Sequence, residues 1–319
     1  MGRHRKHGKH LPRHVYQRNG GYYLRLPNGQ QKWYRRDLPR LLIDWGRIYA
    51  SDTATTLDEV MDQYVLLELE KKAARTQKDY LQYMKRLRPV FGHCRPDDLK
   101  PQDFFKWHEI RTRSSLHQAN RELSFLKTLY KFAICHGWSD ETPAAVSFVS
   151  GNIEKPRTRY VTDEQLRIVY ELAGPTVRVA MELSALTGIR QGDLLRLKRS
   201  DWKENGLHWT QGKTGKKMHV QWSDALSVVY QQGLAIGKTT SIWFLPSRSG
   251  GPYTSDGFRS LWHRLMEKAV AQGMERFTFH DLRAKAGTDA TDWQLLGHSD
   301  RKTHARVYDR KVKPVKPVR

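Results

Sequence analysis

The spacing of apolar residues changes along this chain, and that change limits the folds it can adopt. In residues 15–36, short aromatic-rich runs are separated by the turn signals Asn19-Gly20 and Asn28-Gly29. Asn-Gly between short runs is a strong sign of a β-hairpin, so these residues predict a small three-stranded β module. From Thr56 onward the apolar residues recur at helical spacing. We therefore expect an α+β fold with several domains.

The region after the β module predicts a helical bundle. Thr56 and Glu59 match a capping box at the start of its first helix. The apolar face of that helix consists of Leu57, Val60, Met61 and Tyr64. Further helices are expected over residues 75–91, 100–113 and 117–137.

The second half of the chain predicts a larger, mixed domain. Residues 147–160 are polar, contain Gly and Pro, and have no period, which is typical of a linker. After Val161 we expect helices over residues 163–172, 175–186 and 193–202 and a β-hairpin over residues 207–222. The expected segments are a β module with a basic arm (1–52), a helical domain (53–148), a linker (149–160) and a mainly helical domain with a small sheet (161–319).

The excess of basic residues favours a polyanionic partner. The 319 residues include 56 Lys and Arg against 33 Asp and Glu, a formal net charge of +23. Nucleic acid is the usual partner of such a chain, and a membrane surface is the alternative. No apolar run approaches the roughly 20 residues of a membrane span, and no signal peptide is recognisable. Cys94 and Cys135 lack the spacing of a disulfide framework or a zinc finger, so we expect a soluble, cytoplasmic DNA-handling protein.

Three familiar kinds of site match this sequence poorly. The stretch GKTGKK at 212–217 lacks the earlier glycine of a P-loop, because Leu207 occupies that position. A second candidate at Gly237 fails in the same way, with Gln232 there. His280 and Arg283 lie three residues apart, but arginine is not a zinc ligand, so no metal site is expected. No G-x-S-x-G motif supports a serine hydrolase.

None of the remaining polar residues indicates a function when it is considered alone. Lys213 lies on a short turn between strand-like runs, where most lysines are simply solvated. Arg190 lies between two expected helices, where surface ion pairs are common, and Asp193 could fix its guanidinium group or cap the second helix. Tyr308 lies in a basic segment, ten residues after His298.

In chain order, these residues resemble the catalytic set of the tyrosine recombinase, or phage integrase, family. The matching motifs are TGIRQGDLL, GKTGKK, HDLR, LLGHSD and VYDR, and they contain Arg190, Lys213, His280, Arg283, His298 and Tyr308. Residues 1–52 are similar to the arm-type DNA-binding module of lambda-type integrases, and residues 53–148 to their core-binding domain. The resemblance covers nearly the whole chain. It implies a site-specific DNA recombinase that integrates and excises phage or prophage DNA.

The resemblance also implies a mechanism. Tyr308 attacks a DNA phosphodiester and forms a covalent 3′-phosphotyrosine, so that the bond can be resealed without ATP. Arg190 and Arg283 hold the non-bridging oxygens, and Lys213 protonates the departing 5′ oxygen. His280 accepts the tyrosine proton or positions the phosphate. No metal or other cofactor is expected.

The approach to His298 departs from the family pattern. The resemblance implies that His298 donates a hydrogen bond to a non-bridging oxygen. Only fourteen residues, 284–297, separate it from Arg283, which is shorter than is usual in the family. We therefore expect one helix of this region to be trimmed or lost.

Partners and DNA contacts follow from the same resemblance. We expect a homotetramer on two DNA duplexes, binding core and arm sites in the nucleoid of a bacterial host, with a host DNA-bending protein and an excision factor. Candidate DNA contacts on the basic arm and the strands are Arg3, Arg5, Lys6, Arg25, Lys32 and Arg35. The alternatives are a resolvase or invertase with the same chemistry, a type IB topoisomerase, and a non-catalytic DNA-binding protein that retains the fold.

Overall fold

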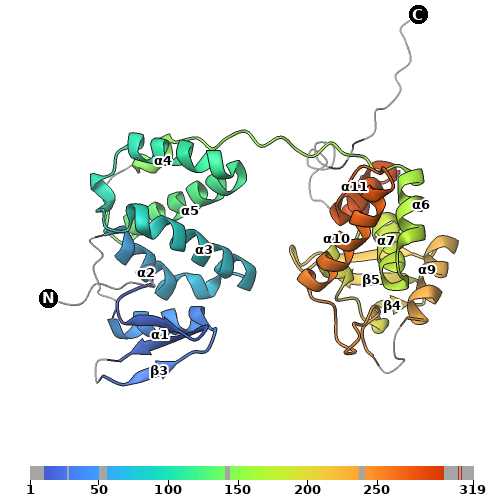
Figure 1. Cartoon of the computed structure of the whole chain (residues 1–319), viewed down its shortest axis with the longest axis horizontal. Helices are drawn as coiled ribbons and strands as arrows, with labels where there is room; N and C mark the ends of the chain where they lie inside the picture. The colour runs from blue at the N-terminus through green and yellow to red at the C-terminus, as the bar shows by residue number, and fades with distance from the viewer. Residues whose placement is uncertain are drawn as a thin grey trace, which may run out of the picture. The chain divides into compact units, whose positions relative to one another are not determined.

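The computed structural model of the chain describes residues 11–26, 29–49, 56–140, 144–236, 241–297, 308 and 310, with Arg47 and Trp293 described by their backbone alone. The chain divides into two compact units, Met1–Glu154 and Lys155–Arg319 (Figure 1). The division falls within the segment that we predicted to be a linker.

The N-terminal sheet consists of β1 (Val15–Arg18), β2 (Gly21–Arg25) and β3 (Gln31–Trp33), antiparallel and in that order. Asn19 and Gly20 form the β1–β2 turn with φ angles of 49° and 72°, the left-handed values that a two-residue hairpin turn requires. Val15 pairs with Leu24, and both side chains are fully buried. The predicted three-stranded β module is confirmed.

A helix that the sequence pattern did not predict follows the sheet. This helix, α1 (Leu38–Tyr49), packs against β2 and against α2 (Leu57–Leu67). Its Asp44 carboxylate accepts hydrogen bonds from Lys32 Nζ at 2.7 Å and Tyr34 Oη at 2.5 Å. These bonds connect α1 to the last strand of the sheet and to the residue just after it.

The predicted bundle is present. Its helices are α2, α3 (Ala74–Phe91), α4 (Pro101–Ser114) and α5 (Leu116–Cys135), with 3₁₀ turns η1 (Leu69–Lys71), η2 (Pro96–Asp98) and η3 (Ala145–Phe148). Thr56 and Glu59 form the expected capping box, with hydrogen bonds of 3.2 and 3.3 Å. Pro89 lies inside α3 instead of ending it, because it removes only one backbone hydrogen bond in the last turn.

The sheet, α1 and the bundle share one hydrophobic core. This core extends from Val15 and Leu24 in the sheet to Phe104, Phe125 and Tyr130 in the bundle. An isolated three-stranded sheet buries little apolar surface and is marginally stable. Packing on the bundle supplies the surface that the sheet lacks.

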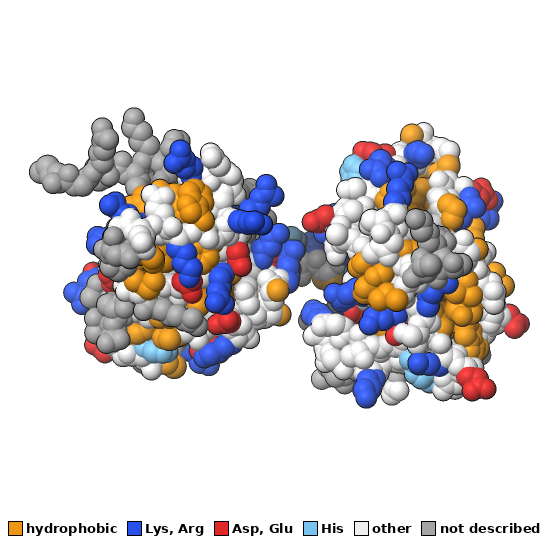
Figure 2. All heavy atoms as spheres, turned by 90° about the horizontal axis from the view of Figure 1, so that it is seen from below, with side chains coloured by type: hydrophobic (Ala, Val, Ile, Leu, Met, Phe, Trp, Pro, Cys, Tyr) orange, Lys and Arg blue, Asp and Glu red, His pale blue; other side chains and the backbone are white. Residues whose placement is uncertain are grey.

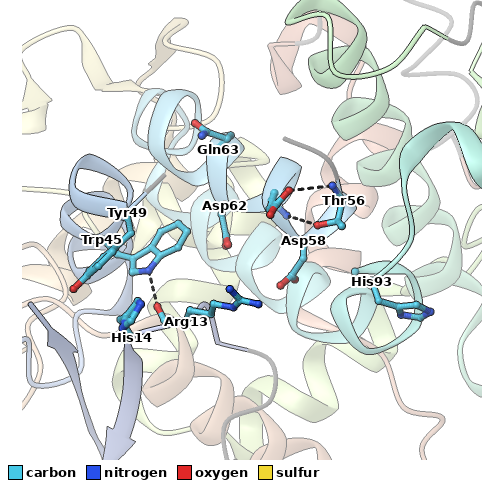
Figure 3. Close-up of a pocket in the computed structure, with 11 residues that line it drawn as sticks. Arg13, His14, Trp45, Tyr49, Thr56, Asp58, Asp62, Gln63 and His93 are labelled. Atoms are coloured by element: carbon cyan, nitrogen blue, oxygen red, sulfur yellow. Dashed lines mark hydrogen bonds between the residues drawn. The ribbon is translucent and has the colours of Figure 1, made fainter. Parts of the chain in front are cut away.

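A cavity of about 500 Å³ lies in this unit near the N-terminus of α2 (Figure 3). Trp45 and Tyr49 contribute aromatic lining, and Asp58 and Asp62 contribute carboxylates. Trp45 Nε1 donates a 2.6 Å hydrogen bond to the carbonyl of Arg13. None of the residues that we predicted to be catalytic lines this cavity.

The unit Lys155–Arg319 is mainly helical, with a small antiparallel sheet in the order β4-β5-β6. Its elements are α6 (Asp163–Leu172), α7 (Pro175–Thr187), α8 (Gln191–Leu194), η4 (Arg199–Asp201), β4 (Trp202–Lys203), β5 (Gly206–Thr210), β6 (Lys217–Gln221), α9 (Asp224–Leu234), α10 (Ser255–Ala271), α11 (Phe279–Asp289) and η5 (Trp293–Leu296). Helix α7 packs against both α9 and α11 (Figure 1). The predicted fold class is confirmed.

The helix predicted over residues 193–202 is wrong in its extent. Helix α8 ends at Leu194, and only the 3₁₀ turn η4 follows before β4. Lys198 forms an isolated β-bridge with Trp243, and Arg199 N donates a 2.9 Å hydrogen bond to the Ile242 carbonyl. A tertiary contact therefore uses backbone groups that a longer helix would have needed.

Basic side chains are prominent on the surface of both units. On the face shown in Figure 2, Lys and Arg side chains are spread over each unit, with fewer Asp and Glu. In the bundle, the fully buried Glu122 carboxylate accepts hydrogen bonds of 2.8 Å from Arg86 and from Arg111. Within the described ranges we find no helix whose length and apolar character would let it span a bilayer.

A buried ion pair generates a prediction for the stability of the first unit. Arg88, with a side chain 5% exposed, donates hydrogen bonds to Asp58 and to Asp62. Burial raises the pKa of Asp62 to about 7 even beside Arg88. Arg88→Met leaves this carboxyl group buried without its partner, which should cost about 3–5 kcal/mol of unfolding free energy at alkaline pH, where the group is ionised.

The pH dependence and a double variant check this explanation by urea unfolding. The loss in Arg88→Met should shrink as the pH falls from alkaline values to about 7, because at and below the wild-type pKa the Asp62 carboxyl group takes up a proton in both folded proteins and carries no charge to leave unpaired. Adding Asp62→Leu should recover most of the stability at all pH values. A double variant as unstable as Arg88→Met would mean that lost packing, and not an unpaired carboxylate, causes the effect.

Candidate active site

Four of the six predicted catalytic residues converge in the C-terminal unit. Tyr308 is 9% exposed, and its ring lies edge-on to the His280 ring with centroids 6.0 Å apart. The guanidinium carbon of Arg283 lies 5.5 Å from the Tyr308 ring centroid. Arg190 is close enough to lower the pKa of both Arg283 and His280. Folding thus brings together residues that are far apart in the sequence.

Helix α11 carries His280 and Arg283 one turn apart. A capping box determines where the helix begins, because Asp281 Oδ2 accepts hydrogen bonds from Thr278 N at 2.8 Å and Thr278 Oγ1 at 2.7 Å. Residues three apart share a helical face. The position of the cap therefore sets the direction of both functional side chains.

The Arg283 side chain connects three segments of the chain. It is 1% exposed, and it donates hydrogen bonds to the Gly188 carbonyl and, at 2.7 Å, to the Leu296 carbonyl. Gly188 caps α7 with a φ of 62°, and a Cβ atom there would come within 2.2 Å of Leu296 Cδ2. Only glycine tolerates both this backbone conformation and this approach.

Arg190 and Arg283 form a strongly positive pair. Arg190 Nη1 is buried and, among the residues that the structure describes, has no hydrogen-bond partner. Burial lowers the pKa of Arg283, and the Arg190 charge lowers it further, whereas a side-chain hydrogen bond with Tyr308 opposes the decrease. An anion between two guanidinium groups would remove their repulsion and satisfy their donors. The pair is therefore suited to an oxyanion.

The backbone around Tyr308 is held by the same unit. The Thr288 hydroxyl donates a hydrogen bond to the Tyr308 carbonyl and accepts one from Arg310 N at 3.1 Å. Arg310 Nη1 donates to Asp281 Oδ1 and to the Arg159 carbonyl, both at 2.7 Å. The backbone at Tyr308 is therefore held against helix α11, beside His280.

Lys213 is exposed on the turn between β5 and β6. The Asp193 carboxylate, a candidate for fixing Arg190 or capping a helix, accepts hydrogen bonds from Gly212 N at 2.9 Å and Arg196 Nη2 at 3.2 Å. Asp193 thereby attaches the Lys213 turn to α8. Because Arg190 immediately precedes α8, one short helix connects the lysine turn with this arginine.

The predicted DNA contacts in the β module differ in their surroundings. Arg25 is exposed on β2, whereas Lys32 on β3 is exposed but paired with Asp44 at 2.7 Å. Arg35 lies beyond the end of β3, at a turn with a φ of 47°, and not on a strand. The remaining predicted residues lie outside the described part of the chain: Arg3, Arg5, Lys6 and His298.

Sequence reasoning missed residues that support this site. Thr288 and Arg310 hold the backbone around Tyr308, and Gln211 is buried beside the Lys213 turn. The partners of Thr288 and Arg310 around Tyr308, and the Leu296 partner of Gln211, lie far away in the sequence, so no local period marks them. The one available signal was the position of Arg310, two residues after the predicted nucleophile.

Comparison with known proteins gives consistent matches. The sequence profile of the phage integrase family matches residues 160–313. The integrase of Enterobacteria phage 434 is 28% identical over 92% of this chain and 96% of its own length. The structure of a lambda integrase dimer bound to a COC′ core site covers 100% of this chain and 99% of its own, with a TM-score of 0.71 and 22% identity. A lambda integrase tetramer bound to a Holliday junction covers 97% and 99%, with a TM-score of 0.66 and 21% identity.

Titration of His280 tests the geometry of the site. His280 is exposed to solvent, but the groups around it partly desolvate its ring and lower its pKa below the ordinary value. The charges of Arg283, Arg310 and Arg190 lower this pKa further, and Asp281 opposes them. NMR titration should therefore place its midpoint below about 6.5. Arg310→Gln removes one positive charge and frees Asp281, so it should raise the midpoint. A wild-type midpoint at or above the ordinary value would contradict the arrangement described.

Proposed function

Through residues 160–313 the chain belongs to the phage integrase family of tyrosine recombinases, and on that premise we propose that Tyr308 is the nucleophile with which it cleaves and rejoins DNA. The chain is a site-specific DNA recombinase. The observation that supports the assignment of Tyr308 is the contact of its ring with His280 and Arg283. A base and an oxyanion site beside one phenol are what phosphoryl transfer to tyrosine requires.

In the proposed reaction, the Tyr308 oxygen attacks the phosphorus of a DNA phosphodiester. The bond between phosphorus and the 5′ oxygen breaks, and a 3′-phosphotyrosine ester forms. The 5′ hydroxyl of another strand then attacks this ester and releases the tyrosine. Because each step exchanges one phosphoester for another, the bond energy is retained and no ATP is consumed.

His280 and Lys213 are the proposed proton-transfer residues. The lowered pKa of His280 keeps its imidazole neutral near pH 7, so that it can accept the Tyr308 proton. Lys213 delivers a proton to the departing 5′ oxygen from the turn that Asp193 anchors. His298, outside the described residues, is proposed to donate a hydrogen bond to a non-bridging oxygen of the phosphate.

Arg190 and Arg283 are proposed to bind the non-bridging oxygens, where negative charge increases in the transition state. The buried Arg190 Nη1 lacks a partner within the described residues, and a phosphate oxygen would supply one. Planar guanidinium donors match two phosphate oxygens at once, which a lysine ammonium group does not. The positive pair also takes the electrostatic role that a metal ion has in other phosphoryl-transfer sites.

The proposal extends to the assembly on DNA. By analogy with the lambda integrase tetramer, four protomers act on two duplexes and integrate or excise phage or prophage DNA in the nucleoid of a bacterial host. A host DNA-bending protein and an excision factor assist them. Arm-type sites are contacted through the β module and its basic arm, with Arg3, Arg5, Lys6, Arg25, Lys32 and Arg35 as the proposed contacts.

Tyr308→Phe removes the attacking oxygen and keeps the ring beside His280. We expect no covalent adduct with a nicked half-site DNA, which traps the cleaved state, and nearly unchanged DNA affinity because no positive charge is lost. Denaturing gels measure the adduct, and gel shifts measure the affinity. Tyr253→Phe, at a half-buried tyrosine elsewhere in the same unit, is the matched control and should form the adduct normally. A phosphotyrosine adduct in Tyr308→Phe would show that another residue is the nucleophile.

Arg190→Ala should slow single-turnover cleavage by about 10²–10³-fold, the cost of losing one oxyanion donor. Arg190→Lys should recover only part of the rate, since one ammonium group cannot replace a bidentate donor. Arg283→Ala should be at least as slow, and its melting temperature should also fall because two backbone carbonyls lose their donor. Arg178→Ala, on α7 outside the site, is the charge-matched control. Equal rates for Arg190→Ala and this control would exclude Arg190 from the phosphate site.

A further inference from the structure

Gln211 is a buried polar residue that none of the proposed chemical steps uses. It directly follows β5, and it is 1% exposed. Burying a primary amide costs free energy unless both its donor and its acceptor find partners. The identity of these partners therefore indicates what the burial of Gln211 achieves.

The first group of partners closes the turn that carries Lys213. Gln211 N donates a hydrogen bond to the Lys216 carbonyl at 2.9 Å, and the Gln211 carbonyl accepts one from Gly215 N at 2.8 Å. In addition, Gln211 Oε1 accepts a hydrogen bond from Thr214 Oγ1 at 2.8 Å. A single residue thus fixes the backbone and one side chain of the turn around Lys213.

The second contact reaches the arginine site. Gln211 Nε2 donates a 3.2 Å hydrogen bond to the Leu296 carbonyl, which also accepts from Arg283 Nη2 at 2.7 Å. Gly297 follows with a φ of 68°, and a Cβ atom there would come within 2.7 Å of Gln211 Nε2 and 2.6 Å of Met218 Sδ. Glycine at this position leaves the space that the Gln211 side chain occupies.

We propose that Gln211 is a positioning residue that orients the proton donor Lys213 relative to the phosphate held by Arg283. The Leu296 carbonyl is the physical link, because it binds the side chains of both Gln211 and Arg283. Lys213 is exposed on a flexible four-carbon stem, so its ammonium group reaches the leaving oxygen efficiently only if its turn is fixed. This inference rests on the proposed role of Lys213 as general acid.

Two substitutions separate positioning from simple stabilisation of the hairpin. Gln211→Met keeps the side-chain volume and removes both of its hydrogen bonds. Gln211→Glu keeps an acceptor for Thr214 and loses the donor to Leu296. Gln231→Met, at an exposed glutamine on α9, is the matched control, and Lys213→Ala is the reference for loss of the proton donor.

The experiment compares single-turnover cleavage of two nicked half-site DNAs by the 319-residue chain. One DNA is ordinary, and the other has a 5′-bridging phosphorothiolate, in which sulfur replaces the leaving oxygen. A thiol has a pKa near ~8.5, far below that of an alcohol, so a thiolate leaves without a proton donor. Gel shifts and thermal melting of each variant measure DNA affinity and folding in parallel.

Both Gln211 variants should cleave ordinary DNA at least about tenfold more slowly than the wild type. This loss is a part of the ~10²–10⁴-fold rate contribution of a general acid. Like Lys213→Ala, they should cleave the phosphorothiolate DNA at close to the wild-type rate. Their DNA affinity should be unchanged, and Gln231→Met should match the wild type on both DNAs.

Three other results would overturn the inference. Equal slowing on both DNAs would mean that Gln211 supports the phosphate site or the fold in general. Wild-type rates on ordinary DNA would mean that the turn does not need Gln211. If the sulfur substitution does not restore cleavage by Lys213→Ala, Lys213 is not the general acid. The inference about Gln211 would then lose its premise.

Discussion

The burial of the Arg283 guanidinium group is the constraint on which the C-terminal unit depends. A positive charge in a 1% exposed side chain is costly unless its donors are satisfied. Two backbone carbonyls accept hydrogen bonds from two of its nitrogens, that of Gly188 at the end of α7 and that of Leu296 in η5. The ends of both segments are therefore placed by hydrogen bonds to one side chain as well as by apolar packing. Arg190 adds a second positive charge beside it, so the two guanidinium groups repel each other unless an anion lies between them.

Helix α11 organises the rest of the site. It carries the side chains of His280 and Arg283, and its own residues hold the backbone around Tyr308. The connection toward His298 contains the end of α11 and the 3₁₀ turn η5 within the described residues. The Leu296 carbonyl at the end of η5 accepts a hydrogen bond from Arg283. This segment thus supplies one of the contacts on which the buried charge relies.

The N-terminal unit depends on a different arrangement. Its sheet is too small to be stable alone, and it gains stability by sharing a core with α1 and the bundle. Buried carboxylates then order the basic side chains: Glu122 holds Arg86 and Arg111, and Asp62 holds Arg88. Arg86 remains about half exposed while it is held in this way.

Local patterns were sufficient for those features that depend on residues close together in the chain. The Asn19-Gly20 turn, the capping box at Thr56 and most helices of the bundle form where their spacing predicts them. The ordered catalytic motifs also indicated the similarity to phage integrases without any coordinates. Helix α1 and the early end of α8 were not predictable, because packing and a β-bridge with a distant segment outweigh local propensity there. The attachment of the Lys213 turn by Asp193 and Gln211, and the burial of Arg283, likewise required the folded chain, since each is a hydrogen bond between residues far apart in sequence, which no local period encodes.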